Sequence, residues 1–157
     1  MRFDKFLLMA AVAAFAAVSC DKANNGTDPS ESVAGTYSGY STAEFQYSPD
    51  PMVSDGQTLT ITSTGEGLVS VSYVSDTWGK FTVNDAKVSE SGDDFSIKGE
   101  GSTLMGMQPG SEQEYPCTFT GTVSGDKTDF SFVFDVPGVM GGLKISVLPG
   151  TAPSTEK

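Results

Sequence analysis

The sequence predicts an all-β domain over residues 33–148, folded as an eight-stranded antiparallel up-and-down barrel. Apolar residues alternate with polar ones at a period of two, and turn residues such as Gly, Asp and Ser separate the alternating segments. No interval between them is long and periodic enough for a central helix. Short connections favour pairing of successive strands, and closure into a barrel removes unpaired edges. An immunoglobulin-like sandwich is the alternative, but the core Cys and Trp pattern of that fold is absent.

The strands are expected at residues 33–40, 59–61, 69–73, 81–88, 95–99, 115–123, 130–134 and 143–147. Within the fourth, Phe81 and Ala86 fall on opposite parities of the alternation, which predicts a β-bulge around Asn84 and Asp85.

Glycines 35, 39, 99 and 121 lie inside the predicted strands, where they suit the sharp bends that closure requires. They also argue for some space inside the barrel. The ten phenylalanines and five tyrosines of the chain could instead fill it. An eight-stranded barrel is just wide enough either to be filled by side chains or to admit one small ligand. The sequence leaves both arrangements open.

Residues 1–19 have the pattern of an export signal. Arg2 and Lys5 form a positive n-region, residues 6–18 are an apolar run too short to span a bilayer, and small residues precede Cys20. Residues 17–20, AVSC, resemble a lipobox, the site at which a bacterial lipoprotein precursor is lipidated on its cysteine and cleaved. The alternatives are an ordinary secretory signal cut near Ser19 and an uncleaved anchor.

These patterns divide the chain into four parts. A lipoprotein signal peptide covers residues 1–19, and the lipidated Cys20 with a flexible tether covers 20–32. The barrel domain covers 33–148, and a disordered tail covers 149–157. The tether and tail are assigned from their polar composition and their lack of apolar periodicity.

The composition argues against several classes of function. The chain has a formal charge of −11 and no histidine, and once residues 1–19 are removed it has no arginine. Nucleic acid and anionic lipid headgroups require clustered positive charge, so neither is an expected partner. Without histidine, the chain lacks a ready general base and the commonest member of nucleophile triads and transition-metal sites. We therefore expect no catalytic residue, no metal site and no cofactor.

Two further features are interpreted as structural. Cys117 alternates in phase with Tyr115 and Phe119, which indicates a buried core residue rather than a nucleophile. Carboxylates occur close together on predicted turns at 93–94, 112–114 and 126–129. Because they lack the spacing of a calcium loop, we interpret them as solvated charge.

The longer connections are expected at one end of the barrel. Successive loops of an up-and-down barrel alternate between its ends, and those at 43–56, 75–79, 104–112 and 136–142 share one parity. They hold all the candidate ligand-binding residues: Met52, Trp78, Met105, Met107, Met140 and Tyr47. Flexible methionines and flat aromatic rings suit a binding rim, although apolar loop residues can also simply plug a barrel end. This end should point away from the membrane, because the tether enters at the other.

Two motifs then suggest a family. Residues 33–39, VAGTYSG, open the first strand and residues 140–147, MGGLKISV, include the last. Together with the lipobox and the tether, they resemble the calycin-like lipoproteins of Bacteroides-type bacteria, over residues 33–148. This resemblance implies a small calycin- or lipocalin-like barrel that carries a lipid or another hydrophobic ligand, and it supplies no catalytic residues.

Residues 35–37 also look like a tyrosine variant of the Gly-x-Trp that opens the first strand of lipocalins. The lipocalin pattern implies a basic residue from the last strand packed on the aromatic ring. Lys144 is the candidate for that role against Tyr37.

Two functions stay open on these grounds. The first is a lipid-anchored cell-envelope binding protein that carries a small hydrophobic or lipid-like ligand at the barrel mouth. The second is a filled barrel that acts as a surface module for binding protein or glycan. The anchor is the expected contact with the membrane, and we expect a monomer. The resemblance favours the outer membrane, while the residues after Cys20 leave the periplasmic or external face open.

Overall fold

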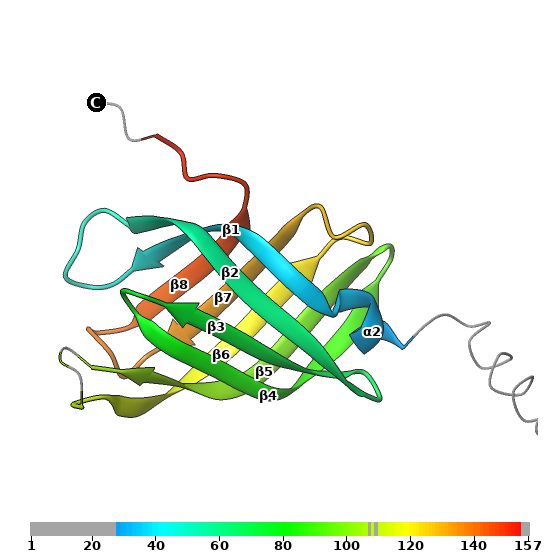
Figure 1. The fold of residues 1–157 in the computed structure, drawn as a ribbon, viewed down its shortest axis with the longest axis horizontal. Coiled ribbons are helices and arrows are strands. Elements are labelled where there is room, and N and C mark those ends of the chain that lie inside the picture. The colour runs from blue at the N-terminus through cyan, green and yellow to red at the C-terminus, as the bar shows by residue number, and fades with distance from the viewer. Residues whose placement is uncertain (1–27, 107, 109, 155–157) are drawn as a thin grey trace, which may run out of the picture.

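A computed structural model describes residues 28–106, 108 and 110–154 of the chain. Its eight strands form one closed antiparallel barrel in sequence order, completed by the pairing of β1 with β8 (Figure 1). The predicted fold class is thereby confirmed. The predicted signal peptide and Cys20 lie outside the described residues. No helix in the described part of the chain is long or apolar enough to cross a membrane.

A short helix, α2, precedes the barrel, and each predicted strand overlaps one observed strand. The elements are α2 (Pro29–Val33), β1 (Gly35–Glu44), β2 (Met52–Gly65), β3 (Leu68–Ser75), β4 (Gly79–Ser91), β5 (Asp94–Met105), β6 (Gln113–Val123), β7 (Phe130–Val136) and β8 (Leu143–Pro149).

The second strand begins earlier than predicted, so the first connection covers residues 45–51 rather than 43–56. The register between β1 and β2 shifts between Gly39 and Ser41, and Gly56 on β2 has a positive φ of 66°. A bulge changes the phase of the in-and-out alternation. The first half of β2 is therefore out of phase with the second half. For this reason the alternation at residues 59–61 did not predict that the strand begins at Met52.

The bulge predicted in β4 is confirmed. Asp85 has a φ of 57°, and the register with β5 shifts between Val83 and Lys87. Gly99 on β5 lies against this bulge, since a Cβ atom there would be 2.7 Å from the Cβ of Ala86. Glycine is required at this position because the bulge already occupies the space that a side chain would need.

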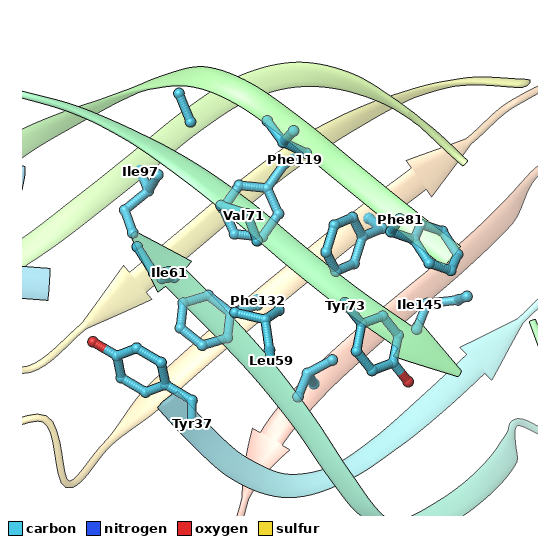
Figure 2. Packing of buried hydrophobic residues seen from close by; sticks show 14 of the residues in the cluster. Tyr37, Leu59, Ile61, Val71, Tyr73, Phe81, Ile97, Phe119, Phe132 and Ile145 are labelled. Carbon is cyan, nitrogen blue, oxygen red and sulfur yellow. The ribbon is translucent and has the colours of Figure 1, made fainter. Parts of the chain in front are cut away.

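Aromatic rings fill the interior of the barrel (Figure 2). Seven buried rings form one continuous cluster with neighbouring centroids 4.8–5.9 Å apart: Tyr37, Tyr73, Phe81, Phe119, Phe130, Phe132 and Phe134. A Cβ on Gly121 would lie 2.8 Å from the ring of Phe132. The expectation that strand glycines leave space inside is therefore wrong at Gly99 and Gly121. They make room for the bulge and the rings.

Helix α2 covers the barrel end that holds the tight turns, opposite the β1–β2 loop (Figure 1). Asp28 caps this helix, because its Oδ1 accepts hydrogen bonds from the Ser30 backbone N–H and hydroxyl and from the Gly67 N–H, at 2.9, 2.8 and 2.9 Å. These bonds lower the pKa of the Asp28 carboxyl, those from Ser30 most strongly. Val33 at the end of the helix is fully buried. Residues 28–32 were expected to belong to the flexible tether, and this part of the prediction is wrong.

The start of the predicted tail is also ordered. Pro149 is the last residue of β8, and the Ala152 N–H donates a hydrogen bond of 2.7 Å to the carboxylate of Asp55. Residues 151–154 form no helix or strand. Proline and alanine gave no apolar alternation, so the sequence pattern did not reveal this contact.

Every strand is paired on both sides, and the buried hydrophobic cluster lies within residues 33–147. The described part of the chain therefore contains a complete core and forms a self-contained folding unit.

Candidate binding site at the barrel mouth

An open cavity of about 730 Å³ lies at the barrel end opposite α2, and we call it the mouth cavity. It is lined by residues from the connections after β1, β3, β5 and β7 and from the adjoining strand ends. Its apolar lining consists of Phe45, Met52, Trp78, Met105, Tyr115, Val139 and Met140. The volume falls within the usual range for small-molecule sites, and the mainly apolar lining with few polar groups is also typical of them.

Four of the six residues predicted for ligand binding line this cavity: Met52, Trp78, Met105 and Met140. Tyr47 does not line it, and 74% of its side chain is exposed. Met107 lies outside the described residues. The structure therefore brings four of these side chains together, while their binding of a ligand stays a prediction.

Eight other residues of the lining were not predicted from the sequence: Phe45, Asp76, Thr77, Gly106, Ser111, Gln113, Tyr115 and Val139. The apolar alternation carried a signal for two of them. Phe45 lies two residues after the buried Ala43, in phase with the inward-facing residues of β1. Tyr115 lies near the start of β6, in phase with the buried Cys117. Because Phe45, Tyr115 and Val139 also pack against the buried core, the cavity rests directly on the filled barrel.

The β3–β4 turn holds Trp78 in place. The hydroxyl oxygen of Ser75 accepts hydrogen bonds from the backbone N–H groups of Thr77 and Trp78, at 3.2 and 3.1 Å. The indole lies edge to face with the ring of Phe45, with 5.8 Å between centroids, and Trp78 is only 7% exposed. Trp78 is therefore part of the cavity wall rather than a ring projecting into solvent.

Glycine is required at the end of this turn. Gly79 has a φ of +95°, and a Cβ there would lie 2.2 Å from the backbone oxygen of Leu104 on β5. The turn therefore packs directly on the β5 backbone, which fixes Trp78 relative to Met105, the next residue on β5.

A second apolar feature lies on the outside of the wall beside the mouth. Val74 on β3 and Leu104 on β5 are 61% and 44% exposed. Lys80 on β4 lies in register with both, so the three residues form one row across the strands. We call Val74 and Leu104 the outer-wall pair, and neither lines the mouth cavity.

The prediction that Lys144 packs on the ring of Tyr37 is wrong. Lys144 is exposed near the mouth, where it pairs in register with Glu44, while Tyr37 packs edge-on against Phe130 and Phe132. The two residues lie at different levels of the barrel, because β8 pairs only with the second half of β1.

Instead, Lys127 from the β6–β7 connection reaches the start of β1. Its Nζ donates a hydrogen bond of 2.8 Å to the carbonyl oxygen of Ala34. A basic residue therefore does reach the first strand, but it contacts the backbone and comes from another part of the chain.

Cys117 is a buried core residue, as its alternation predicted, and is 3% exposed. Burial raises the pKa of its thiol to about 11, so the reactive thiolate is scarce near neutral pH.

At the opposite end from the mouth, Asp126 accepts hydrogen bonds from the hydroxyls of Ser124 and Thr128, which lower its pKa to about 2. Within the described ranges, no three His, Cys, Asp or Glu residues come together as a metal site would require.

Comparison with known proteins supplies a family and one structural relative. Residues 33–148 match the family described as the calycin-like beta-barrel domain. The crystal structure of a putative outer membrane protein from Bacteroides fragilis is similar, with a TM-score of 0.66 and 28% sequence identity. The alignment covers 81% of this chain but 48% of that protein, so the chain spans about half of its length. Among curated proteins, none matches the sequence.

Proposed function

Since the chain belongs to the calycin-like β-barrel domain family, we propose that it is a lipid-anchored binding protein of the cell envelope that holds a small apolar or amphipathic ligand in the mouth cavity. The cavity itself carries this proposal. It offers about 730 Å³ of open space lined by three methionines and three aromatic rings. Methionine adapts to different ligand shapes, and aromatic rings provide flat contact area.

The ligand would lie over the barrel rather than inside it. The seven-ring cluster fills the interior from Tyr37 near α2 to Tyr73 and Phe81 on the side of the mouth. Protein interiors are close-packed, so an acyl chain could enter only by displacing buried rings. The ligand should therefore be small, or should leave part of its length in solvent.

The anchor and the location rest on other grounds. The lipobox-like residues 17–20 support lipidation of Cys20, and the relative described as a putative outer membrane protein supports an outer-membrane location. The chain enters the barrel at the α2 end, so an anchored molecule would hold its mouth away from the membrane. Replacing Cys20 with Ser should release the protein from the membrane fraction and remove the acyl mass from its N-terminus.

Binding rather than catalysis is the proposed activity. The chain has no histidine, and its thiol at Cys117 is buried with a raised pKa. The mouth cavity therefore offers neither of the commonest nucleophile–base pairs.

Native mass spectrometry of the protein purified from its own cells tests the proposal. We expect an adduct of reproducible mass that organic extraction removes and identifies. The double variant Met52→Ser/Met140→Ser should lose it, because both residues line the cavity and are 44% and 39% exposed, so the substitutions leave the core intact. Retention of the adduct by this variant would place the ligand elsewhere and overturn the proposal.

The outer-wall pair favours a second function, a surface module that binds another protein. Val74 and Leu104 are exposed apolar residues beside the mouth, one on each side of Lys80, and together they would give a bound protein apolar contact area next to a positive charge. The double variant Val74→Ser/Leu104→Ser separates the two functions. If it loses a protein partner while the adduct persists, the barrel acts as an interaction module as well.

A further inference from the structure

The mouth cavity has a charge of one sign. Asp76 in the β3–β4 turn lines it, and no lysine is among the described residues of its lining. The other polar side chains of the lining, Thr77, Ser111 and Gln113, are uncharged. The described lining therefore includes one acidic residue, the exposed Asp76, and no positively charged one.

Further carboxylates surround this end of the barrel. They lie on the strand ends and connections beside the cavity and are all exposed: Glu44, Asp50, Glu112, Glu114 and Asp135. Summed charge of one sign around an opening attracts the oppositely charged ligand and repels one of like charge.

Within the described part of the chain, two lysines lie at this end, and they do not offset the charge inside the cavity. Lys144 on β8 lies in register between Glu44 and Asp135, and Lys80 lies in the outer-wall row between Val74 and Leu104. Both are exposed, and neither lines the cavity. The field that a ligand meets at the mouth is therefore negative.

Three aromatic rings line the same cavity as Asp76, those of Phe45, Trp78 and Tyr115. The face of an aromatic ring attracts a cation, and aromatic residues grouped around a site are the usual means of holding quaternary ammonium groups. Rings and a carboxylate in one apolar cavity are together complementary to an organic cation with an apolar body.

We infer that the mouth cavity selects cationic amphiphiles, in which an ammonium or quaternary ammonium group is joined to an apolar body, over anionic ones such as fatty acids. This inference rests on the proposed binding function and adds the charge of the ligand. A carboxylate head placed beside Asp76 would have no partner to offset its repulsion and loss of hydration.

Three probes with the same dodecyl chain test the inference: dodecyltrimethylammonium, dodecyl maltoside and dodecyl sulfate. Each is titrated, below its micelle concentration, into residues 21–157, which include the self-contained folding unit. Circular dichroism confirms that the protein stays folded. We expect one saturable site at which the cation binds about tenfold more tightly than the neutral probe, and the anion more weakly than either. High salt should reduce the difference.

The variant Asp76→Asn should bring the cation and the neutral probe to within about threefold of each other, since it removes the lining carboxylate. Asp93→Asn is the matched control, because it removes the same charge from an exposed turn at the opposite end. It should leave the preference unchanged. The double variant Met52→Ser/Met140→Ser should weaken the binding of all three probes, which would locate their binding site in the cavity.

The possible failures are distinguishable. Equal binding of the three probes, or preference for the sulfate, would overturn the inference while leaving the mouth cavity a binding site. Cation binding that responds equally to Asp76→Asn and Asp93→Asn would also overturn it, since the effect would come from net charge. Absence of binding by every probe would overturn both the inference and the proposed function.

Discussion

The phenolic hydroxyl of Tyr37 on β1 donates a hydrogen bond of 2.5 Å to the backbone carbonyl oxygen of Val33, the last residue of α2. Both residues are buried. This bond ties the helix to the first strand and closes the barrel end opposite the mouth. The ring of Tyr37 belongs to the aromatic cluster, so the same side chain joins the closed end to the filled interior.

Replacing Tyr37 with Phe should lower the free energy of unfolding by about 1–2 kcal/mol, because the ring is kept but the buried Val33 carbonyl loses its donor. Urea unfolding measures the change. Tyr47→Phe is the control, since Tyr47 is 74% exposed, and it should change stability by less than about 0.5 kcal/mol. Equal stability of the two variants would show that the hydroxyl contributes nothing to closing this end.

Alkaline pH should destabilise the fold through the same residue. Burial raises the pKa of Tyr37 to about 12 from 10.0. The folded state therefore keeps its proton where the unfolded state loses it, so the stabilisation is full below pH 10 and is lost as the pH rises toward 12. Unfolding followed between pH 9 and 12 should show a steeper decline for the parent protein than for Tyr37→Phe. Identical slopes would contradict the assignment.

The presence of eight strands could be predicted from the apolar alternation and from the turn residues between the alternating segments. The β4 bulge could also be predicted, because Phe81 and Ala86 lie on opposite parities of the alternation. The β2 bulge could not be predicted, because residues 52–57 are mostly polar or exposed and form no apolar pattern that a bulge would interrupt. Helix α2 escaped prediction because its order comes from the Asp28 cap and contacts with distant residues such as Ser63 and Gly67.

For the site, the alternation of loops between the two barrel ends was enough to predict that Met52, Trp78, Met105 and Met140 lie at one end. It could not give the depth of each side chain. Trp78 is buried because Ser75 and Gly79 set the geometry of the β3–β4 turn, whereas Tyr47 in the β1–β2 connection projects into solvent. It also could not show that the interior is filled, since glycine is compatible both with open space and with close packing.

Gly99→Ala should destabilise the barrel by about 1–3 kcal/mol, because a methyl group there would lie 2.7 Å from the Cβ of Ala86 in the β4 bulge. Gly138→Ala is the matched control, because its Cβ would meet only the ring of Tyr115 at an ordinary 3.7 Å. Thermal and urea unfolding of the two variants compare them. A neutral Gly99→Ala would mean that space exists beside the bulge and that the interior is less filled than described.

Cys117 should be unreactive while the protein is folded, because it is buried and its pKa is raised to about 11. Residues 21–157 contain this one thiol. At pH 8, a disulfide-exchange reagent should label it slowly in buffer and within seconds in concentrated urea. Rapid labelling of the folded protein would contradict its place in the core.

The most direct test of ligand binding over a filled barrel uses Trp78, which is the only tryptophan in the chain and lines the mouth cavity. An uncharged alkyl glycoside with a brominated chain is titrated into residues 21–157 while the tryptophan fluorescence is recorded. We predict saturable quenching at one site, lost in Met52→Ser/Met140→Ser and kept in Val74→Ser/Leu104→Ser. Binding of the glycoside without quenching, or quenching that survives the methionine substitutions, would contradict the account.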